Sequence, residues 1–432
     1  MTEKNSLNGG QMIVDHLIAQ KVPYAIGLCG HGNIGFIDAL YERTDDIKTV
    51  SVRHESVAGF MADVYYRVSG QATATFTSCG PGNANMPICL GNAFLDSVPV
   101  FAVTANVPTS QFGRGAFQEL YRHYQADFPS TIKAYCKRVF QPTRGEQVPM
   151  MVREAWKTMV TGRQGPVVLD VPFDIFKEET GAEPPDPKAW TDNISCRAGA
   201  DPEGVAKAAE MLMNAERPVI MIGQGCRYGE ASTLLLKLAE KYQIPVAASA
   251  SGLGAIPADH PLALGLVARN GPYQANHATR QADVILALGM RFDDRTSSSW
   301  IPGYSFNIPP TRLIHVDIDP EEIGRNYPVA LGLMADSRTF LAQLLAALEA
   351  QPSGPTPARR KWLAAIDGWR KEWDAFVEPG FHDTATPINP QRAAREIDLA
   401  LPDDAILVSD IGIHHNWLIQ FCKPKRPDSL IG

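Results

Sequence analysis

Arg53-His54-Glu55 is the first string in the sequence whose residue types could do chemistry. The apolar pattern places it where a strand over 49–52 passes into a helix over about 55–68. In a parallel sheet such a junction lies at the carboxyl edge, where open α/β sheets bind their ligands. A short string of this kind also occurs as an ordinary capped helix with a surface glutamate. The sequence therefore predicts a ligand-facing carboxylate at Glu55, with the capped surface helix as the alternative.

Two glycine-rich turns form a second group of candidates. Gly27-Leu28-Cys29-Gly30 follows one apolar run, and Gly80-Pro81-Gly82 follows another. Because glycine has no Cβ, the backbone at such a turn can approach a ligand closely. An ordinary strand-to-helix turn would use the same residues, so both meanings stay open for each string.

The elements that must hold these residues alternate along the chain. Nearly continuous apolar runs take turns with segments that have apolar residues at helical spacing. Strands of this kind are buried on both faces, which indicates a parallel sheet covered by helices on each side. We expect strands over 24–27, 49–52, 72–77, 98–104 and 167–171, and helices over 11–21, 36–41, 55–68 and 84–94. The predicted fold class is α/β, with successive doubly wound parallel-sheet domains.

The same alternation resumes after a polar stretch over 175–200, which is typical of a linker. A second unit ends near residue 350 and is followed by the proline-rich string QPSGPTP over 351–357. Its expected strands cover 218–222, 245–248, 284–288 and 313–317, with helices over 231–242 and 340–350. We therefore expect a domain over 1–180, a second over 190–350, and the beginning of a third, incomplete one over 375–432.

Composition excludes several classes of partner. The chain has 432 residues and a formal net charge of −7, with no block of basic residues, so nucleic acid and anionic membranes are not expected as partners. No apolar run is long enough to span a bilayer, and the polar N-terminus has no signal-peptide core. The seven cysteines are scattered without a CxxC string, which indicates reduced thiols and a cytoplasmic protein.

A family resemblance is carried by strings spread over nearly the whole chain. They are RHESVAGFMADVYYRVSG over 53–70, Gly80-Pro81-Gly82, Ala93 to Pro99, SGLGAIP over 251–257, GMRFDDR over 289–295, HVDIDP over 315–320 and DIG over 410–412. In this order they resemble the thiamine-diphosphate enzymes of the acetohydroxyacid (acetolactate) synthase and pyruvate oxidase group. That resemblance implies a pyrimidine-binding domain, a central domain and a diphosphate-binding domain.

The resemblance assigns roles in the first domain. Glu55 matches a glutamate that hydrogen-bonds the aminopyrimidine of the cofactor, a task that suits a carboxylate because it shares a proton at short range. Gln118 matches an amide over the reacting carbon, while Phe117 is expected to pack. His31 stands where the synthases have a small residue, so it is a candidate for proton relay or a bystander. The implied thiamine-diphosphate contacts here are Cys29, Gly30, Gly82 and Asn85, with Cys79 structural.

The central domain raises the question of a second cofactor. In acetohydroxyacid synthases it holds FAD, whereas other relatives bind ADP or nothing there. The residues that match positions near the flavin are Arg163, Gly223, Gly225, Arg291, Arg295 and Asp317. The string VARNG over 267–271 departs from the synthase pattern Gly-Met-His-Gly beside that site. FAD is therefore a candidate cofactor that the sequence leaves undecided.

The last segment matches the opening of the diphosphate-binding domain. Gly412 and His414 match residues that contact the diphosphate, and Ile413 replaces a family glutamine. For His415 a plain surface position is one interpretation. The family's Mg²⁺ motif, Gly-Asp-Gly followed by Asn, is absent from these 432 residues, so we expect the magnesium ligands beyond residue 432.

The function implied is a thiamine-diphosphate-dependent carboligase or decarboxylase acting on a 2-oxo acid such as pyruvate, similar to acetolactate synthase. The same residues would serve another C–C lyase, an oxidase or a 2-oxo acid decarboxylase. A different class, a non-catalytic nucleotide-binding regulatory homologue, would explain the missing metal motif. The family implies a homodimer or homotetramer whose active sites are shared between subunits.

Overall fold

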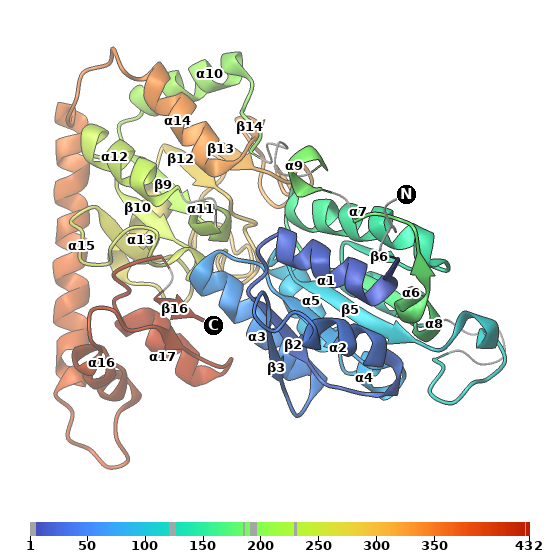
Figure 1. Cartoon of the computed structure of the whole chain (residues 1–432). Coiled ribbons are helices and arrows are strands. Elements are labelled where there is room, and N and C mark those ends of the chain that lie inside the picture. Colours follow the sequence, from blue (N-terminus) through green and yellow to red (C-terminus); the bar gives the residue numbers. More distant parts are fainter. Residues whose placement is uncertain (1–5, 121–126, 185, 191–196, 229–230, 428) are drawn as a thin grey trace. The chain divides into compact units, whose positions relative to one another are not determined.

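The computed structural model describes residues 6–120, 127–184, 186–190, 197–228, 231–427 and 429–432. It divides into two compact units, unit 1 over 1–196 and unit 2 over 197–432 (Figure 1). Each unit contains one six-stranded parallel sheet with helices packed on it. The α/β class with successive parallel-sheet units, predicted from alternating apolar runs, is confirmed.

The sheet of unit 1 has the strand order β3-β2-β4-β5-β7-β6, and every neighbouring pair is parallel. In that order the strands are Lys48–Ser51, Tyr24–Gly27, Ala74–Thr77, Phe101–Asn106, Val167–Pro172 and Arg138–Phe140. The central strands β4 and β7 are buried at every position, because helices cover both of their faces. This arrangement brings the carboxyl ends of β3, β2 and β4 side by side.

Helices of unit 1 pack in two groups. Helix α1 contacts α2, α7 and α8, whereas α3 contacts α5 together with β2 and β4. Their bounds are α1 Gly9–Ala19, α2 Ile34–Tyr41, α3 Glu55–Ser69, α4 Pro81–Ala84, α5 Pro87–Leu95, α6 Phe128–Ile132, α7 Val148–Val160, α8 Phe173–Lys177 and α9 Pro187–Trp190. Single turns of 3-10 helix occur at His31–Asn33, Thr109–Gln111, Lys133–Tyr135 and Gly145–Gln147.

Two expectations for unit 1 differ from the structure. The helix expected over 84–94 is two helices, α4 and α5, each with a proline in its first turn, where the missing N–H costs nothing. The polar stretch taken as a linker begins with ordered elements, because α8 follows β7 directly and β8 (Glu179–Thr180) pairs antiparallel with β1 (Leu7–Asn8). Composition did not reveal these elements because both are short.

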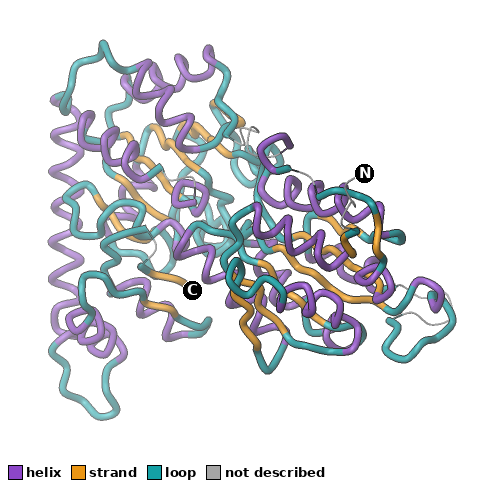
Figure 2. Tube along the Cα trace, in the orientation of Figure 1, coloured by secondary structure: helices purple, strands orange, loops and turns teal. Residues whose placement is uncertain are grey.

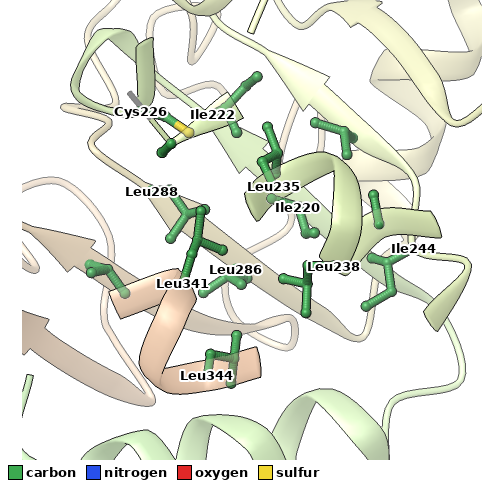
Figure 3. Close-up of a cluster of buried hydrophobic side chains, with 14 of the residues drawn as sticks. Ile220, Ile222, Cys226, Leu235, Leu238, Ile244, Leu286, Leu288, Leu341 and Leu344 are labelled. Atoms are coloured by element: carbon green, nitrogen blue, oxygen red, sulfur yellow. The ribbon is translucent and has the colours of Figure 1, made fainter. Parts of the chain in front are cut away.

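Unit 2 repeats the design with the strand order β11-β10-β9-β12-β13-β14. These strands are Ala263–Leu266, Val246–Ala248, Pro218–Ile222, Val284–Leu288, Arg312–Asp317 and Leu331–Met334. Alternate residues of β9 enter different cores, Ile220 and Ile222 on one face and Val219 and Met221 on the other. Figure 3 shows the first of these cores, in which α12 (Ser232–Tyr242) and α14 (Ser337–Ala347) cover the sheet.

A 25-residue helix, α15 (Pro357–Phe381), follows the proline-rich string over 351–357 and packs against α13 (Tyr273–Gln281) (Figure 2). Near its start lies Arg359, whose side chain is completely buried. The guanidinium donates to the carbonyls of Ala215, Tyr242, Leu212 and Met213, at the ends of α10 (Pro202–Met213) and α12. Arg359 thus supplies donors to carbonyls at helix C-termini, where the helix itself provides few. The Leu212 carbonyl also accepts the Ala215 N–H at 3.4 Å.

The remaining elements of unit 2 are short. They are α11 Gln224–Tyr228, a 3-10 turn Ala250–Gly252, α16 Pro390–Ala400, β15 Leu407–Val408, α17 Ile413–Phe421 and β16 Leu430–Ile431. Strands β15 and β16 pair in parallel as a two-stranded sheet. Helices α16 and α17 pack on each other, and α16 also packs on α15. The segment expected to begin a third domain is therefore clustered with unit 2.

Candidate active site

The carboxylate predicted to face a ligand lies directly after the edge strand of unit 1. Glu55 is the first residue of α3, and His54 caps this helix because its Nδ1 accepts the N–H of Ser56 at 3.3 Å. The helix ends at Gly70, whose φ of 70° is left-handed. The helix is capped, as the structural alternative required, but the glutamate is not at the surface: it is 9% exposed.

The Glu55 carboxylate is held beside the turn after β4. Asn85 Nδ2 donates to Oε2 at 2.8 Å, and a Cβ placed on Gly82 would lie 3.1 Å from Oε1. Because Gly82 has no side chain, a space remains next to Oε1 that any other residue would fill. We call this space the cradle at Gly82. A buried carboxylate with one amide donor and an adjacent open cradle fits a ring that presents a nitrogen able to share a proton.

The turn after β2 is packed against the turn after β4. A Cβ on Gly30 would lie 2.5 Å from Ser78 Cβ, and the Gly32 N–H donates to Ser78 Oγ at 3.1 Å. Asn33 closes the first turn by accepting the Gly30 N–H and donating to the Leu28 carbonyl. The structure thus brings together the glycines that the sequence singled out, although the close approach at Gly30 is to the chain itself.

Cys29 and His31 lie in this first turn and are both exposed. The His31 ring stacks on Phe173 at a centroid distance of 4.9 Å and an interplanar angle of 16°. Lys177 Nζ lies 4.8 Å from the centroid of the same Phe173 ring. Stacking fixes the imidazole on the first turn of α8, so its position is set by packing rather than left free in a loop.

Gln118 reaches the same turns from the loop after β5. Its backbone is left-handed, with φ 69°, a conformation that costs a residue with a Cβ about 1–2 kcal/mol. A Cβ on Gly80 would lie 2.8 Å from Gln118 Cβ, and Cys79 Sγ lies 3.7 Å from Gln118 Oε1. Strain of this kind at a site with polar neighbours is typical of a residue kept for its side chain. The expectation that Phe117 packs is wrong, because its side chain is 89% exposed.

Two polar groups that support this edge were missed in the sequence. Asn83 accepts from Thr77 Oγ1 and donates to the Ala105 carbonyl, each at 2.8 Å, which ties the turn after β4 to β5. The loop after β5 is closed by Glu119, which accepts from three backbone N–H groups. Both are polar residues next to a predicted motif in the sequence. That position was the one sign that could have marked them as supporting residues.

Asp170, in the middle of β7, is a third missed residue and is completely buried. Its Oδ1 accepts from Thr104 Oγ1 at 2.8 Å, and its Oδ2 accepts from Asn106 Nδ2 and Gln141 Nε2 at 2.7 Å each. Burial raises the pKa of Asp170 to about 6, although these hydrogen bonds favour the charged form. Asn106 and Gln141 also line a cavity of about 290 Å³ with Glu119.

The glycines predicted to approach a flavin in unit 2 are used in another way. A Cβ on Gly223 would lie 2.1 Å from the Gly289 carbonyl oxygen, and one on Gly225 would lie 2.9 Å from Gly289 Cα. The Gly225 N–H also donates to the Gly289 carbonyl at 3.2 Å. In the described residues these glycines therefore allow two turns of the chain to touch each other.

The other flavin candidates belong to both units. Arg163 lies in unit 1, where its guanidinium donates to Ser97 Oγ and the Leu95 carbonyl. Asp317 ends β13 and accepts the Asp319 N–H at 2.9 Å. Arg291 follows β12 and is partly exposed, and its carbonyl accepts from Asn326. Arg163 and Asp317 each have hydrogen-bond partners within their own unit.

The diphosphate candidates lie together at the start of α17. A Cβ on Gly412 would lie 2.6 Å from the His414 ring, and His414 itself is exposed. His415, for which a plain surface position was one interpretation, is partly buried. Burial lowers the pKa of His415, and the positive charges of His414 and Arg295 lower it further. Arg295, which belongs to another of the predicted strings, is thus near enough to this helix start to act on His415.

Within the described ranges, no group of three or more His, Cys, Asp or Glu side chains could hold a metal ion. The six described cysteines are free thiols, and Cys196 lies outside the described residues. Burial raises the pKa of the thiols of Cys89, Cys136, Cys226 and Cys422 to about 12, which makes them unreactive. No described helix combines the length and apolarity that a membrane span requires.

Comparison with protein families agrees with this geometry. Residues 7–126 match the thiamine pyrophosphate enzyme N-terminal TPP binding domain, and residues 205–344 match the central domain of the same enzymes. Glu55, Gly82, Asn85 and Gln118 all fall within the first match. The fold and the site therefore define a thiamine pyrophosphate (thiamine diphosphate) enzyme.

Curated relatives narrow this class. A probable acetolactate synthase large subunit of Methanocaldococcus jannaschii is 35% identical over 98% of this chain and 70% of its own length. The isozyme 3 and isozyme 1 large subunits of Escherichia coli acetolactate synthase are each 31% identical over 97% and 98% of this chain, and over 71% of their own lengths. The chain thus belongs to the acetolactate synthase-like branch of the thiamine pyrophosphate enzymes.

Proposed function

We propose that this chain catalyses a carboligase or decarboxylase reaction that removes CO₂ from a 2-oxo acid such as pyruvate and passes the aldehyde unit to an acceptor. The observation that carries the proposal is the buried Glu55 carboxylate, bonded to Asn85 and facing the cradle at Gly82. This constellation lies inside the region that matches a thiamine pyrophosphate binding domain. The names of the curated relatives favour acetolactate formation among such reactions.

Each residue of the site has a definable task. Thiamine diphosphate, when bound, supplies an electron sink for the pair left when CO₂ departs. Glu55 would hold a proton at Oε1 against the aminopyrimidine, while Asn85 fixes the other oxygen and keeps the carboxylate oriented. The amide of Gln118 would donate to developing negative charge on substrate oxygen without titrating. Cys29 and Gly30 would line the site through their backbone.

His31 is proposed as a group that relays protons to a substrate carbonyl. The His31 side chain is exposed, and its ring stacks on Phe173. An exposed ring in a fixed position suits a group that must reach a bound substrate. A decarboxylase or lyase would make fuller use of such a group than a synthase. This residue is the specific feature that favours the second candidate function, a 2-oxo acid decarboxylase or another C–C lyase.

Further cofactors belong to the proposal. Mg²⁺ would neutralise the cofactor diphosphate. Gly412 and His414 would contact the same diphosphate, and the positive surroundings of His415 support an anion at this helix start. FAD is proposed as a second cofactor with Arg291, Arg295 and Asp317 near it; a flavin absorption band in the purified protein would test this.

A homodimer or homotetramer in the cytoplasm is proposed as the working form. Exposed apolar residues share one face of α3 (Val57, Phe60 and Met61) and one face of α5 (Ile88 and Leu95). A surface of this kind on two packed helices supports a subunit interface. The free thiols support a reducing compartment.

The test is a panel of 2-oxo acids incubated with the full-length protein, thiamine diphosphate and Mg²⁺, with CO₂ release and the organic product measured. We expect pyruvate to release CO₂ and to yield acetolactate, in a reaction that requires the cofactor. Release of CO₂ with free aldehyde as the product would favour the decarboxylase, and no release from any 2-oxo acid would exclude both.

A further inference from the structure

The loop that carries Gln118 is closed on itself by one carboxylate. Glu119 Oε1 accepts the Gly113 N–H at 2.7 Å, and Oε2 accepts the N–H groups of Gly115 and Ala116 at 3.0 and 3.2 Å. The Glu119 N–H in turn donates to the Ala116 carbonyl at 3.0 Å. Hydrogen bonds to an ionised acceptor are the stronger kind, so this carboxylate is the main tie within the loop.

The backbone of the loop is arranged around this tie. Gly113 and Gly115 have left-handed φ values of 72° and 69°, which turn successive N–H groups towards one point. Such alternation makes a concavity that binds an anion, and here the anion is the side chain of Glu119. Gln118 is the third left-handed residue, and it lies inside the turn that the Glu119 N–H closes.

Gln118 cannot hold this conformation by its own preference, because its Cβ disfavours a positive φ. On its far side the backbone of Gly80, itself left-handed, leaves the space that Gln118 Cβ approaches. Glu119 on one side and Gly80 on the other therefore fix where the Gln118 amide lies. We propose that Glu119 is a positioning residue, whose carboxylate ties Gly113, Gly115 and Ala116 and thereby holds Gln118 against the turn at Gly80.

This inference rests on the proposed function, in which the Gln118 amide meets the substrate. It predicts that Glu119→Ala lowers kcat by roughly 10- to 100-fold, because a small misplacement of a positioned group can cost about 100-fold. KM and the affinity for thiamine diphosphate change little, since Glu119 itself touches neither. Glu119→Gln keeps one acceptor oxygen, so its kcat should lie between those of Glu119→Ala and the wild type. The control is Glu146→Ala, an exposed glutamate in the same unit, with activity equal to the wild type.

A double-mutant cycle separates positioning from general loss of structure. If Glu119 acts through Gln118, the Glu119→Ala change in a Gln118→Ala background costs no more than about 2-fold further, because coupled residues are not additive. Full additivity of the two losses would overturn the positioning role.

A second readout needs no activity. Arg114 is exposed between the two glycines, so trypsin cleavage of the Arg114–Gly115 bond reports opening of the loop. We expect roughly 10-fold faster cleavage at this bond in Glu119→Ala than in Glu146→Ala, followed by mass spectrometry of the native protein. Unchanged cleavage would overturn the inference even if activity falls. A wild-type protein without CO₂ release would sink the proposed function and the positioning role with it, whereas faster cleavage would still show that Glu119 closes the loop.

Discussion

Both units bury ionisable side chains, but they use them in opposite ways. In unit 2 the guanidinium of Arg359 donates to four carbonyls at the ends of two helices, and its side chain is completely buried. In unit 1 the carboxylate of Glu55 has one amide donor and an adjoining cradle at Gly82. The hydrogen bonds of Arg359 are made within the fold, whereas Glu55 has an oxygen next to open space.

The glycines of the two sheets differ in the same sense. Gly223 and Gly225 in unit 2 let two turns of backbone touch, whereas Gly82 in unit 1 leaves space beside a carboxylate. Gly223 and Gly225 thus serve packing, whereas the space at Gly82 is the one that the proposed function uses. The contrast predicts that changes at the unit 1 edge cost rate, and that changes at buried charges of unit 2 cost stability.

The largest effect is expected for Glu55→Gln. Loss of a group that exchanges a proton should lower kcat by about 100- to 10,000-fold, while the amide preserves the shape of the pocket. Thiamine diphosphate binding, measured by calorimetric titration, should survive in part, and the thermal midpoint should change little. Glu146→Gln is the matched control, and a Glu55→Gln protein with near-wild-type activity would remove the assignment.

Arg359→Met should produce the largest loss of stability. It leaves the carbonyls of Ala215 and Tyr242 buried without their donor, which we expect to cost about 3 kcal/mol in free energy of unfolding. The neighbouring Arg360 is exposed, so Arg360→Met should stay within about 0.5 kcal/mol of the wild type. Thermal unfolding followed by circular dichroism compares the two, and equal midpoints would contradict the role given to Arg359.

Two buried groups of unit 1, His16 and Asp170, should change its stability in opposite directions as the pH falls. Burial lowers the pKa of His16 from 6.5 to about 4, so the folded state resists a proton that the unfolded chain accepts. Its contribution to stability is complete above pH 6.5 and is lost as the pH falls towards 4. Asp170 has the opposite sign: its folded pKa is raised from 3.8 to about 6, so its contribution is complete below pH 3.8 and is lost as the pH rises through 6.

The two contributions nearly cancel, because each amounts to about 3 kcal/mol over overlapping pH ranges at 1.36 kcal/mol per pKa unit. Asp170→Asn removes one of them, so the stability of unit 1 should fall about 2 kcal/mol further between pH 6 and pH 4 than in the wild type. Hydrogen exchange of the β5 and β7 amides across that range measures it. Parallel pH curves for the two proteins would show that Asp170 does not titrate in this range.

His31→Ala should have the smallest effect. We expect kcat to fall roughly 10-fold with unchanged cofactor affinity, at the low end for loss of a proton-transfer group. His382→Ala in unit 2 is the control, because His382 is an exposed histidine paired with Glu378. Unchanged kinetics in His31→Ala would leave the ring as a stacking partner of Phe173 alone.

Much of this architecture could be predicted from apolar periodicity. The strands β9 and β12 were found because every residue in them is buried, which makes their runs continuous. The strands β6, β11 and β14 were missed: β6 has only three residues, and β11 and β14 each contain a glycine, which interrupts the apolar run. The single helix expected over 84–94 failed at Pro87, whose ring begins a new helix instead of continuing the old one.

The site was predictable where a motif joins a residue type to a turn, as at Glu55 and Gly82. Supporting contacts from distant strands could not be predicted, because Asp170 meets Thr104 and Gln141 only in the folded sheet. The exposure of Phe117 was equally invisible, because an aromatic residue in a loop gives no sign of which way its ring faces. Contacts at long sequence separation are set by topology, and local pattern carries no record of them.

The most direct test of the contrast between the units is the rate of CO₂ release from pyruvate per folded protein, measured side by side for Glu55→Gln and Arg359→Met at a temperature where both are folded. If Glu55 takes part in the chemistry, Glu55→Gln should lose the rate. If Arg359 only stabilises the fold, Arg359→Met should keep the wild-type rate. A wild-type rate in Glu55→Gln, or an equal loss in both, would contradict the division of labour between the two units.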